Sequence, residues 1–231
     1  MSAPFRFRQF TIANDRAAMK VGTDGVLLGA WTPLGEAVEI LDAGTGTGII
    51  ALMLAQRSSG GAHVTAIDID PAAVEEAADN FRNSPWDGIL NAECISFQEF
   101  SGRAGNDARF DLIVSNPPFF SASLKAPDER RSAARHTDTL GSALIIEGSL
   151  RLLAPQGHLA IILPVAEGMD FVAEAEPAGL HLIRMCRVST KSGKPAKRLL
   201  MEFSREATAP VFEELALDSE AFRTLTAEFY L

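Results

Sequence analysis

The stretch AVEILDAGTGTGIIALMLAQR (residues 37–57) joins three kinds of local sequence pattern. Residues 37–44 have the apolar composition of a strand that ends at a glycine, and residues 49–57 have that of the helix that follows. Between them, Gly44, Gly46 and Gly48 alternate with threonines. Glycine lets a backbone turn sharply and approach a ligand closely. The stretch therefore predicts a strand–turn–helix unit with a ligand-binding turn.

The same alternation of strand and helix continues along the chain. A Lys/Gly/Pro loop separates the last two predicted strands, which is typical of an antiparallel hairpin. Alternating strands and helices imply a doubly wound parallel sheet. We expect an α/β fold with a mixed seven-stranded sheet, helices on both faces and an antiparallel closing hairpin. The predicted strands cover residues 37–44, 63–70, 91–97, 110–116, 157–164, 180–189 and 197–204, and further helices cover residues 71–83 and 139–154.

The bulk composition favours one intracellular domain. The 231 residues, 47% of them hydrophobic, fit a single domain over residues 1–231, with an N-terminal segment (1–35), a core (36–205) and a C-terminal helical addition (206–231). The net charge of −9 argues against non-specific coating of nucleic acid, although it allows a local basic face. Cys94 and Cys186 lie in apolar stretches and are expected to be buried, reduced thiols. No apolar run has the length of a membrane span, and the N-terminus lacks the apolar core of a signal peptide, so we expect a cytoplasmic location.

The glycine turn departs from the common nucleotide-binding patterns. Ile49 stands where the dinucleotide fingerprint has its third glycine, and no Walker lysine follows. Asp42, just before the turn, indicates a cationic or polyol partner instead of a phosphate. Asp68 ends the next predicted strand, where a carboxylate can accept both hydroxyls of a ribose. Its alternative role is a helix N-cap before Pro71, which Asp70 fills better.

A second unusual stretch is DLIVSNPPFF (residues 111–120), a strand that ends in two prolines and two phenylalanines. The prolines remove backbone donors and hold the chain extended. The side-chain oxygen of Asn116 and the carbonyl of Pro117 can then accept both N–H bonds of a planar amine, while Phe119 offers a stacking face. The alternative is a strand terminator with core aromatics. In a parallel sheet this stretch, the glycine turn and Asp68 should meet at one edge.

The motifs DAGTGTG (42–48), AIDID (66–70) and NPPFF (116–120) resemble those of the Rossmann-like S-adenosylmethionine-dependent methyltransferases that act on planar nitrogens. This resemblance implies S-adenosyl-L-methionine as cofactor. Residues 7–31, together with LMLAQR (52–57), NSPW (83–86) and the EFYL end, are similar to the bacterial tRNA(Val) adenosine-37 N6-methyltransferases over almost the whole chain. The implied function is methylation of adenosine N6 at position 37. The cofactor-binding residues implied are Thr23, Asp42, Gly44, Gly46, Gly48, Asp68, Ser96, Phe97 and Asn116, and the catalytic ones are Asn116, Pro117 and Phe119.

Two of these implied contacts have particular positions. Thr23, with Asp24, would help close the methionine end of the cofactor, although either residue can instead be the N-cap of a helix. Relatives often carry an acidic residue at the end of the third strand, where it accepts the adenine amino group. Here Ser96 stands at that position, and we expect it to accept the bond while Phe97 stacks on the ring.

A tRNA substrate is the partner that the resemblance implies, and basic residues near the predicted edge fit it. Solvated surface residues are the alternative for each cluster. The same Asn-Pro-Pro-aromatic motif also occurs in guanine N2-methyltransferases of ribosomal RNA and glutamine N5-methyltransferases of release factors, and a non-catalytic binding module is a further alternative. No metal pattern is present, and the oligomeric state stays open. The predicted RNA-binding residues are Lys20, Lys125, Arg130, Arg135, Lys194, Lys197 and Arg198.

Overall fold

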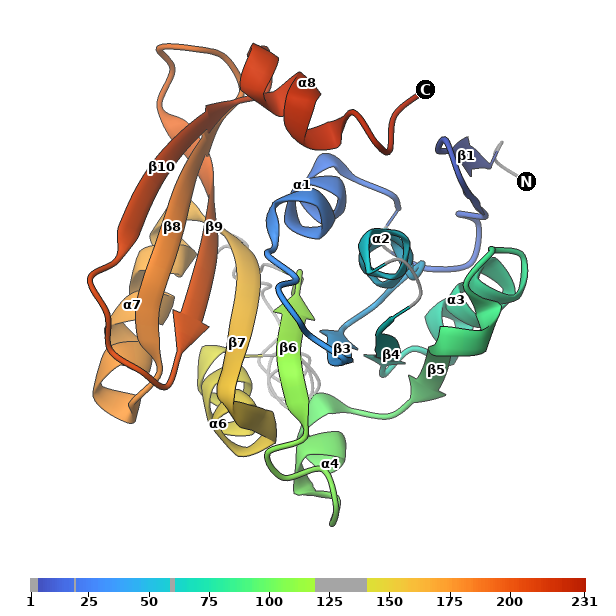
Figure 1. Ribbon diagram of the computed structural model, residues 1–231, viewed down its shortest axis with the longest axis horizontal. Coiled ribbons are helices and arrows are strands. Elements are labelled where there is room, and N and C mark those ends of the chain that lie inside the picture. The colour runs from blue at the N-terminus through green and yellow to red at the C-terminus, as the bar shows by residue number, and fades with distance from the viewer. Residues whose placement is uncertain (1–3, 19, 59–60, 119–140) are drawn as a thin grey trace, which may run out of the picture.

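A computed structural model describes residues 4–18, 20–58, 61–118 and 141–231. Its centre is a mixed sheet in the order β10-β8-β9-β7-β6-β3-β4-β5, with helices on both faces (Figure 1). The strands of this sheet are β3 (Glu39–Ala43), β4 (His63–Asp68), β5 (Leu90–Cys94), β6 (Phe110–Ser115), β7 (Leu153–Pro164), β8 (His181–Ser189), β9 (Ala196–Ser204) and β10 (Val211–Ala216). The helices are α1 (Thr23–Trp31), α2 (Ile49–Arg57), α3 (Pro71–Arg82), α4 (Phe97–Gly102), α6 (Ser142–Leu152), α7 (Val165–Ala178) and α8 (Glu220–Thr226).

Alternating side chains of the strands divide the core into two layers. Ile40 of β3 packs with the buried residues of α1 and α2, whereas its neighbour Leu41 packs with those of α4, α6 and α7. Both side chains are fully buried. This pattern follows from the period of two in a strand, since successive side chains point to opposite faces of the sheet. The predicted α/β fold with helices on both faces is confirmed.

The parallel register brings three strand ends to one level. Ala43 pairs with Ile67 of β4 and with Ser115 of β6. The hydroxyl of Ser115 also donates to the carbonyl of Ala43 at 2.8 Å. The residues that follow these pairs are Gly44, Asp68 and Asn116. The register therefore places the glycine turn, the acidic strand end and the Asn-Pro-Pro stretch beside one another, as the sequence predicts.

The C-terminal segment differs from the prediction of a helical addition. Residues Val211–Ala216 form β10, which pairs in parallel with β8, so the described sheet has eight strands instead of seven. Alternation explains the pairing: Leu215 is buried, whereas Phe212 is 66% exposed. An edge strand such as β10 buries few side chains, so its sequence shows little alternation of apolar and polar residues and does not predict a clear strand. The predicted terminal helix is present as α8.

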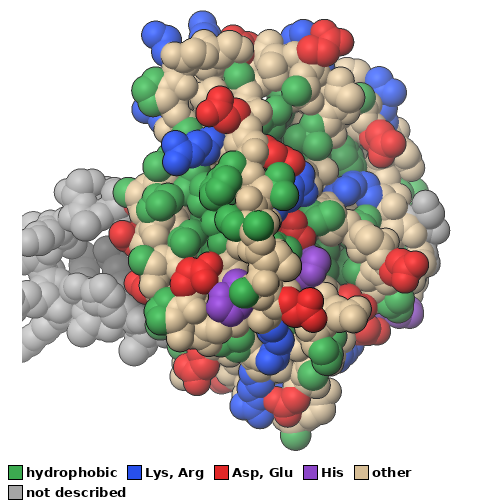
Figure 2. All heavy atoms as spheres, turned by 60° about the vertical axis from the view of Figure 1, so that its left-hand side comes forward, with side chains coloured by type: hydrophobic (Ala, Val, Ile, Leu, Met, Phe, Trp, Pro, Cys, Tyr) green, Lys and Arg blue, Asp and Glu red, His purple; other side chains and the backbone are tan. Residues whose placement is uncertain are grey.

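Figure 2 turns the β10 edge of the sheet forward and shows acidic and basic side chains scattered among hydrophobic ones.

Near the opposite edge, the predicted strand over residues 91–97 ends early. Its last strand residue is Cys94, and Phe97 already begins α4. Cys94 is exposed, so the prediction of two buried thiols is wrong for this residue. It is confirmed for Cys186, where burial raises the pKa of the thiol to about 12.

The N-terminal segment contains a small hairpin that the sequence did not predict. Strands β1 (Phe5–Arg6) and β2 (Thr11–Ile12) pair antiparallel to each other. The ring of Phe7 lies 4.7 Å from that of Phe10 and 6.0 Å from that of Tyr230. These aromatic contacts pack the N-terminal hairpin against the C-terminus, and the chain then runs from the hairpin toward α1.

Candidate functional site

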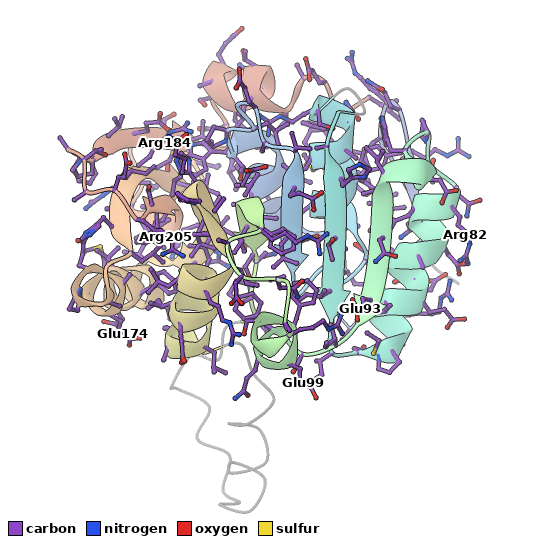
Figure 3. The ribbon with its side chains drawn as sticks, turned by 60° about the horizontal axis from the view of Figure 1, so that its bottom comes forward. Arg82, Glu93, Glu99, Glu174, Arg184 and Arg205 are labelled. Carbon is purple, nitrogen blue, oxygen red and sulfur yellow. The ribbon has the colours of Figure 1, made fainter. Side chains whose placement is uncertain are left out.

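A cavity of about 760 Å³ opens where the register brings the strand ends together. The glycine turn, the end of β4 and the start of α4 form its walls, and residues preceding and beginning α1 close another side. Figure 3 labels Glu99 on α4 and Arg82, which is the last residue of α3. The predicted site residues that line the cavity are Lys20, Thr23, Gly44, Gly46, Asp68, Ser96, Phe97 and Asn116.

The three glycines of the turn have different surroundings. All have positive φ angles, 77° at Gly44, 54° at Gly46 and 82° at Gly48. A Cβ at Gly46 would meet no atom within 4 Å, so the backbone there is open to a ligand. A Cβ at Gly48 would lie 2.5 Å from the ring of Phe81. Gly44 and Gly46 therefore line the cavity, while Gly48 allows α2 to pack against α3.

Asp68 joins the glycine turn to the start of α3. Its Oδ2 accepts a hydrogen bond from the Gly46 N–H at 2.9 Å, and its Oδ1 accepts one from the Asp70 N–H at 2.9 Å. Asp70 caps α3 by accepting from the Ala72 N–H at 2.9 Å. The alternative role of Asp68 as a helix cap is therefore wrong. Each Asp68 oxygen retains accepting capacity toward the cavity, and its ligand contact stays a prediction.

Asp42 lies behind the glycine turn and does not line the cavity. Its carboxylate is fully buried, and its Oδ2 accepts from the Thr45 hydroxyl at 2.6 Å. Its Oδ1 has no hydrogen-bond partner among the described residues. Burial is the main cause that raises the pKa of Asp42 to about 7. The structure thus provides a buried carboxyl under the turn, and its direct contact with a ligand stays a prediction.

The raised pKa of Asp42 predicts a pH dependence of stability. The folded-state value of about 7 exceeds the ordinary 3.8, so the folded protein binds more protons than the unfolded one between them. This stabilisation is complete below the unfolded pKa and is lost as the pH rises through about 7, with a slope of at most ~1.4 kcal/mol per pH unit. Asp42→Asn should flatten that slope in urea unfolding from about pH 5 to about pH 8. If the free energy of unfolding depended on pH in the same way in the wild-type protein and in Asp42→Asn, this prediction would be wrong.

Asn116 lines the cavity and carries an unused acceptor. Its Oδ1 is buried and has no hydrogen-bond partner among the described residues. An unpaired buried polar atom costs stability, so it marks a position that a ligand can satisfy. Pro117 is buried and Pro118 is exposed at the cavity wall. Phe119 lies outside the described residues, and the catalytic roles of all three predicted residues stay predictions.

Ser96 and Phe97 line the cavity but have structural partners. The Ser96 hydroxyl donates to Glu99 Oε2 at 2.6 Å and accepts from the Glu99 N–H at 3.2 Å, which forms a capping box at the start of α4. Phe97 is buried, and its ring leaves no room for a Cβ at Gly148 of α6. Ser96 is therefore a helix cap, and the exposed carboxylate at this wall belongs to Glu99. The pattern SFQE (96–99) carried the signal for this pair.

The cap assignment makes Ser96→Ala a mild variant. Loss of an N-cap side chain costs about 1 kcal/mol, so we expect the melting temperature to fall by a few degrees. Cofactor affinity should change by less than about threefold, because Glu99 still lies at the cavity wall. Thermal unfolding and calorimetry measure the two effects. A large loss of affinity with an unchanged melting temperature would restore Ser96 as a direct contact.

The start of α1 forms the opposite wall. Thr23 and Asp24 both line the cavity, but Gly22 is the N-cap residue of α1, so neither side chain has the alternative capping role. Asp24 Oδ2 accepts from Arg198 Nε of β9 at 2.7 Å. Sequence reasoning missed this ion pair because its partners are far apart along the chain. It joins the cavity wall to the antiparallel part of the sheet.

The family model that matches residues 21–174 describes a methyltransferase small domain. The chain belongs to this methyltransferase family. It is 44% identical to the tRNA1(Val) (adenine(37)-N6)-methyltransferase of Bacteroides fragilis, over 100% of this chain and 99% of the relative. It is also 44% identical to the enzyme of the same name from Tolumonas auensis, over 98% and 96% of the two chains.

Solved structures share the fold of this methyltransferase at low identity. A predicted O-methyltransferase from Agrobacterium tumefaciens has a TM-score of 0.67 at 17% identity, covering 89% of this chain and 96% of the other. P. horikoshii TYW2, solved in complex with MeSAdo, has a TM-score of 0.58 at 14% identity, covering 87% and 70%. These matches confirm the Rossmann-like methyltransferase fold that the sequence predicts.

The cavity of this methyltransferase fits S-adenosylmethionine. The open backbone at Gly46 admits a close ligand, and the Asp68 carboxylate beside it is an acceptor suited to ribose hydroxyls. The exposed Glu99 carboxylate lies at another wall, where it can accept from an amino group. S-adenosyl-L-methionine is thus the cofactor of this family member, and the individual contacts stay predictions.

The predicted RNA-binding residues of this methyltransferase differ in their surroundings. Lys194 is exposed in the turn between β8 and β9, and Lys197 is exposed near the start of β9. Lys20 is also exposed, and its ammonium donates to the carbonyl of Asn14. Arg198 also lies on β9, where its guanidinium is in the ion pair with Asp24. Lys125, Arg130 and Arg135 lie outside the described residues.

Two further observations concern metal binding and membrane spans in the described parts of the chain. Their His, Cys, Asp and Glu side chains form no group of three or more that could hold a metal ion. None of the helices in those parts is both long enough and apolar enough to cross a membrane. The longest of the described helices, α7, has 14 residues.

Proposed function

We propose that this methyltransferase transfers a methyl group to the exocyclic N6 of an adenosine in tRNA, at position 37 of tRNA1(Val). Relatives that carry this activity in their names match the chain from end to end. The observation that carries the proposal is the buried Asn116 Oδ1, which has no partner in the described chain and belongs to a residue that lines the cavity. An acceptor in that position suits the N–H of a planar amine.

The adenine amine is a poor nucleophile because its lone pair is delocalised into the ring. Bound S-adenosylmethionine supplies the methyl group as an electrophilic carbon on a sulfonium. Asn116 accepts one amine N–H, and the Pro117 carbonyl accepts the other, which draws the nitrogen toward a tetrahedral geometry. Proline holds the local backbone, so the carbonyl needs little reordering. The nitrogen bonds to the methyl carbon as the bond from that carbon to sulfur breaks, and the methylated nitrogen then loses a proton to water. The protein contributes alignment and acceptors, and the Asn-Pro-Pro motif contains no general base.

The target base must leave its stack to reach a site below the protein surface. Flipping a nucleotide costs a few kcal/mol and least where the base is not paired, so an anticodon-loop adenosine is an inexpensive target. Once flipped, a base can stack on an aromatic side chain, the role that we assign to Phe119. The loop context thus supports tRNA over a duplex substrate.

The exposed lysines in the β8–β9 turn and at the start of β9 yield a prediction for RNA docking. Replacing Lys194 and Lys197 by glutamine should weaken tRNA binding and lower the salt slope of log Kd by about 1 for each phosphate that is no longer neutralised. Arg198 is kept, because its replacement would also break the ion pair with Asp24. Filter binding over a salt series measures the slope, and cofactor affinity is the control. An unchanged slope would leave this turn a solvated hairpin.

Three labelled transfer reactions test the proposed function against its alternatives. The protein is incubated with tritiated S-adenosylmethionine and with unmodified tRNA, ribosomal RNA or release-factor protein in turn. We expect label in tRNA alone. Label in ribosomal RNA would support the guanine N2 alternative, label in protein would support the glutamine N5 alternative, and no label in any substrate would support a non-catalytic binding module.

A further inference from the structure

A short segment before α1, residues 13–18, forms part of the cofactor cavity; we call it the strap. Ala17 and Ala18 of the strap line the cavity. The strap has no regular secondary structure, and it follows the β1–β2 hairpin, drawn in dark blue in Figure 1. A segment without its own ladder of hydrogen bonds depends on side chains for a fixed position. The question is which side chains hold it.

One buried carboxylate on α3 accepts from three consecutive backbone N–H groups of the strap. Glu76 Oε1 accepts from the N–H groups of Asp15 at 2.6 Å and Arg16 at 2.9 Å. Glu76 Oε2 accepts from the N–H of Ala17 at 2.9 Å. Glu76 is fully buried, and three charge-assisted bonds to consecutive amides offset the cost of that burial. Its position under the strap is therefore specific.

The electrostatic surroundings keep this carboxylate ionised. Burial alone would raise the pKa of Glu76, but the backbone donors of Arg16, Ala17 and Asp15 and the charge of Arg16 bring it below its usual value. The Arg16 guanidinium also pairs with Glu75 and Asp79 on the outer side of α3. The strap is thus tied to α3 by an inner, buried anchor and an outer, exposed ion pair.

Asn80, one helical turn further along α3, links the strap to the glycine turn. Its Oδ1 accepts from the Ala13 N–H at 2.8 Å, and its Nδ2 donates to the Ala13 carbonyl at 3.1 Å. The same amide group donates to the carbonyl of Thr47 at 2.9 Å. Thr47 is a residue of the glycine turn and lines the cavity. A single buried side chain therefore connects two walls of the cofactor site.

We propose that Glu76 and Asn80 are positioning residues that hold the strap as a wall of the cofactor cavity. Neither lines the cavity, so both act through the strap and the glycine turn. When a binding-competent state is only partly populated, the apparent affinity falls by the populated fraction. Loss of the anchor thus weakens cofactor binding while leaving the Asn116 site intact. The inference rests on the proposed function in one respect, namely that this cavity holds the cofactor.

Glu76→Gln tests the anchor with little change in volume. Its carbonyl oxygen can still accept from Asp15 and Arg16, but its amide group would face the Ala17 N–H, donor against donor. We expect the Kd for S-adenosylhomocysteine, measured by calorimetry, to rise about tenfold. Amide exchange in the strap should quicken in the protein without ligand, and kcat at saturating cofactor should change little. Asn80→Asp, which sets a carboxylate against two carbonyls, should act in the same direction.

Two controls separate positioning from general destabilisation. Glu75→Gln changes an exposed carboxylate on the same helix that contacts Arg16. Glu202→Gln changes another buried carboxylate, on β9, which contacts His158 and Arg184. Glu75→Gln removes one exposed ion pair and leaves the Asp79 partner of Arg16, so the Kd and strap exchange should change far less than in Glu76→Gln. Glu202→Gln should keep the wild-type Kd and strap exchange while it lowers the melting temperature.

The outcomes that overturn the inference are distinct from those that overturn the function. A Glu76→Gln protein with wild-type Kd would remove Glu76 as a positioning residue, and so would a Kd raised equally in Glu202→Gln. Faster strap exchange together with a raised Kd, confined to the Glu76 and Asn80 variants, would support it. A wild-type protein that binds no S-adenosylhomocysteine would contradict the cofactor assignment, while strap exchange that quickens only in Glu76→Gln would still support the anchor.

Discussion

Asn116→Ala is expected to lower methyl transfer to unmodified tRNA by about 100- to 1,000-fold, the range seen when one preorganised hydrogen-bonding group is removed from an active site. The reason is the buried Oδ1 of Asn116, which no described residue satisfies. The neighbouring strand should survive, because the Ser115 hydroxyl still bonds to the Ala43 carbonyl. Affinity for S-adenosylhomocysteine should stay within about threefold, since the glycine turn and Asp68 are unchanged. Single-turnover transfer and calorimetry measure the two quantities.

Matched variants distinguish the loss of an acceptor from a loss of stability. Asn116→Asp should lose less activity than Asn116→Ala, because a carboxylate oxygen still accepts the amine N–H. Asn106→Ala removes another buried amide, whose Nδ2 donates to the Phe100 carbonyl at 2.9 Å. Asn106 does not line the cavity. It should lower the melting temperature and leave transfer nearly unchanged. Near-normal transfer by Asn116→Ala would contradict the amine-presenting role.

Asp68→Ala is expected to weaken cofactor binding by about 10- to 100-fold, which corresponds to the loss of one or two hydrogen bonds to a charged group. The carboxylate has two functions in the structure. It accepts from the Gly46 N–H, which holds the glycine turn, and it faces the cavity as a free acceptor. Its removal should therefore affect both the shape of the turn and the ligand contact. Calorimetry with S-adenosylhomocysteine measures the loss.

The neighbouring carboxylate supplies the control for Asp68. Asp70 caps α3 through the Ala72 N–H. Asp70→Ala should cost about 1 kcal/mol of stability. Cofactor affinity in Asp70→Ala should change far less than in Asp68→Ala, although Asp70 also lies at the cavity wall. If Asp70→Ala weakened binding as much as Asp68→Ala, the effect would come from α3 and not from a contact of Asp68.

The sequence predicted the parts of the site that depend on local pattern and on sheet topology. Asp68 and Asn116 each end a strand, and parallel register alone brings strand ends to one edge. The same reasoning placed Gly44 and Gly46 at that edge. Gly48 shows its limit, because its positive φ serves packing against Phe81 and not ligand approach. The glycine motif therefore predicted the turn itself, but it did not distinguish the glycines that line the cavity from the one that serves packing.

Contacts between distant segments were beyond local pattern. Arg198 is a predicted RNA-binding residue, but β9 brings it to Asp24, 174 residues away along the chain. Glu76 looked like one of several acidic residues on α3, yet it alone lies under the strap with a buried carboxylate. Ser96 caps α4 together with Glu99, and its predicted contact with the cofactor stays a prediction. Arg198 and Glu76 each have a partner that only the folded chain identifies, whereas the partner of Ser96 lies three residues away within SFQE (96–99).

The modified nucleoside is the measurement that tests the central claim most directly. Unmodified tRNA1(Val) is methylated with labelled S-adenosylmethionine, digested to nucleosides and separated by chromatography with mass detection. We predict N6-methyladenosine as the labelled product, and no label in a transcript whose position 37 carries guanosine. Labelled N2-methylguanosine, or N6-methyladenosine that persists in the guanosine-37 transcript, would contradict the account.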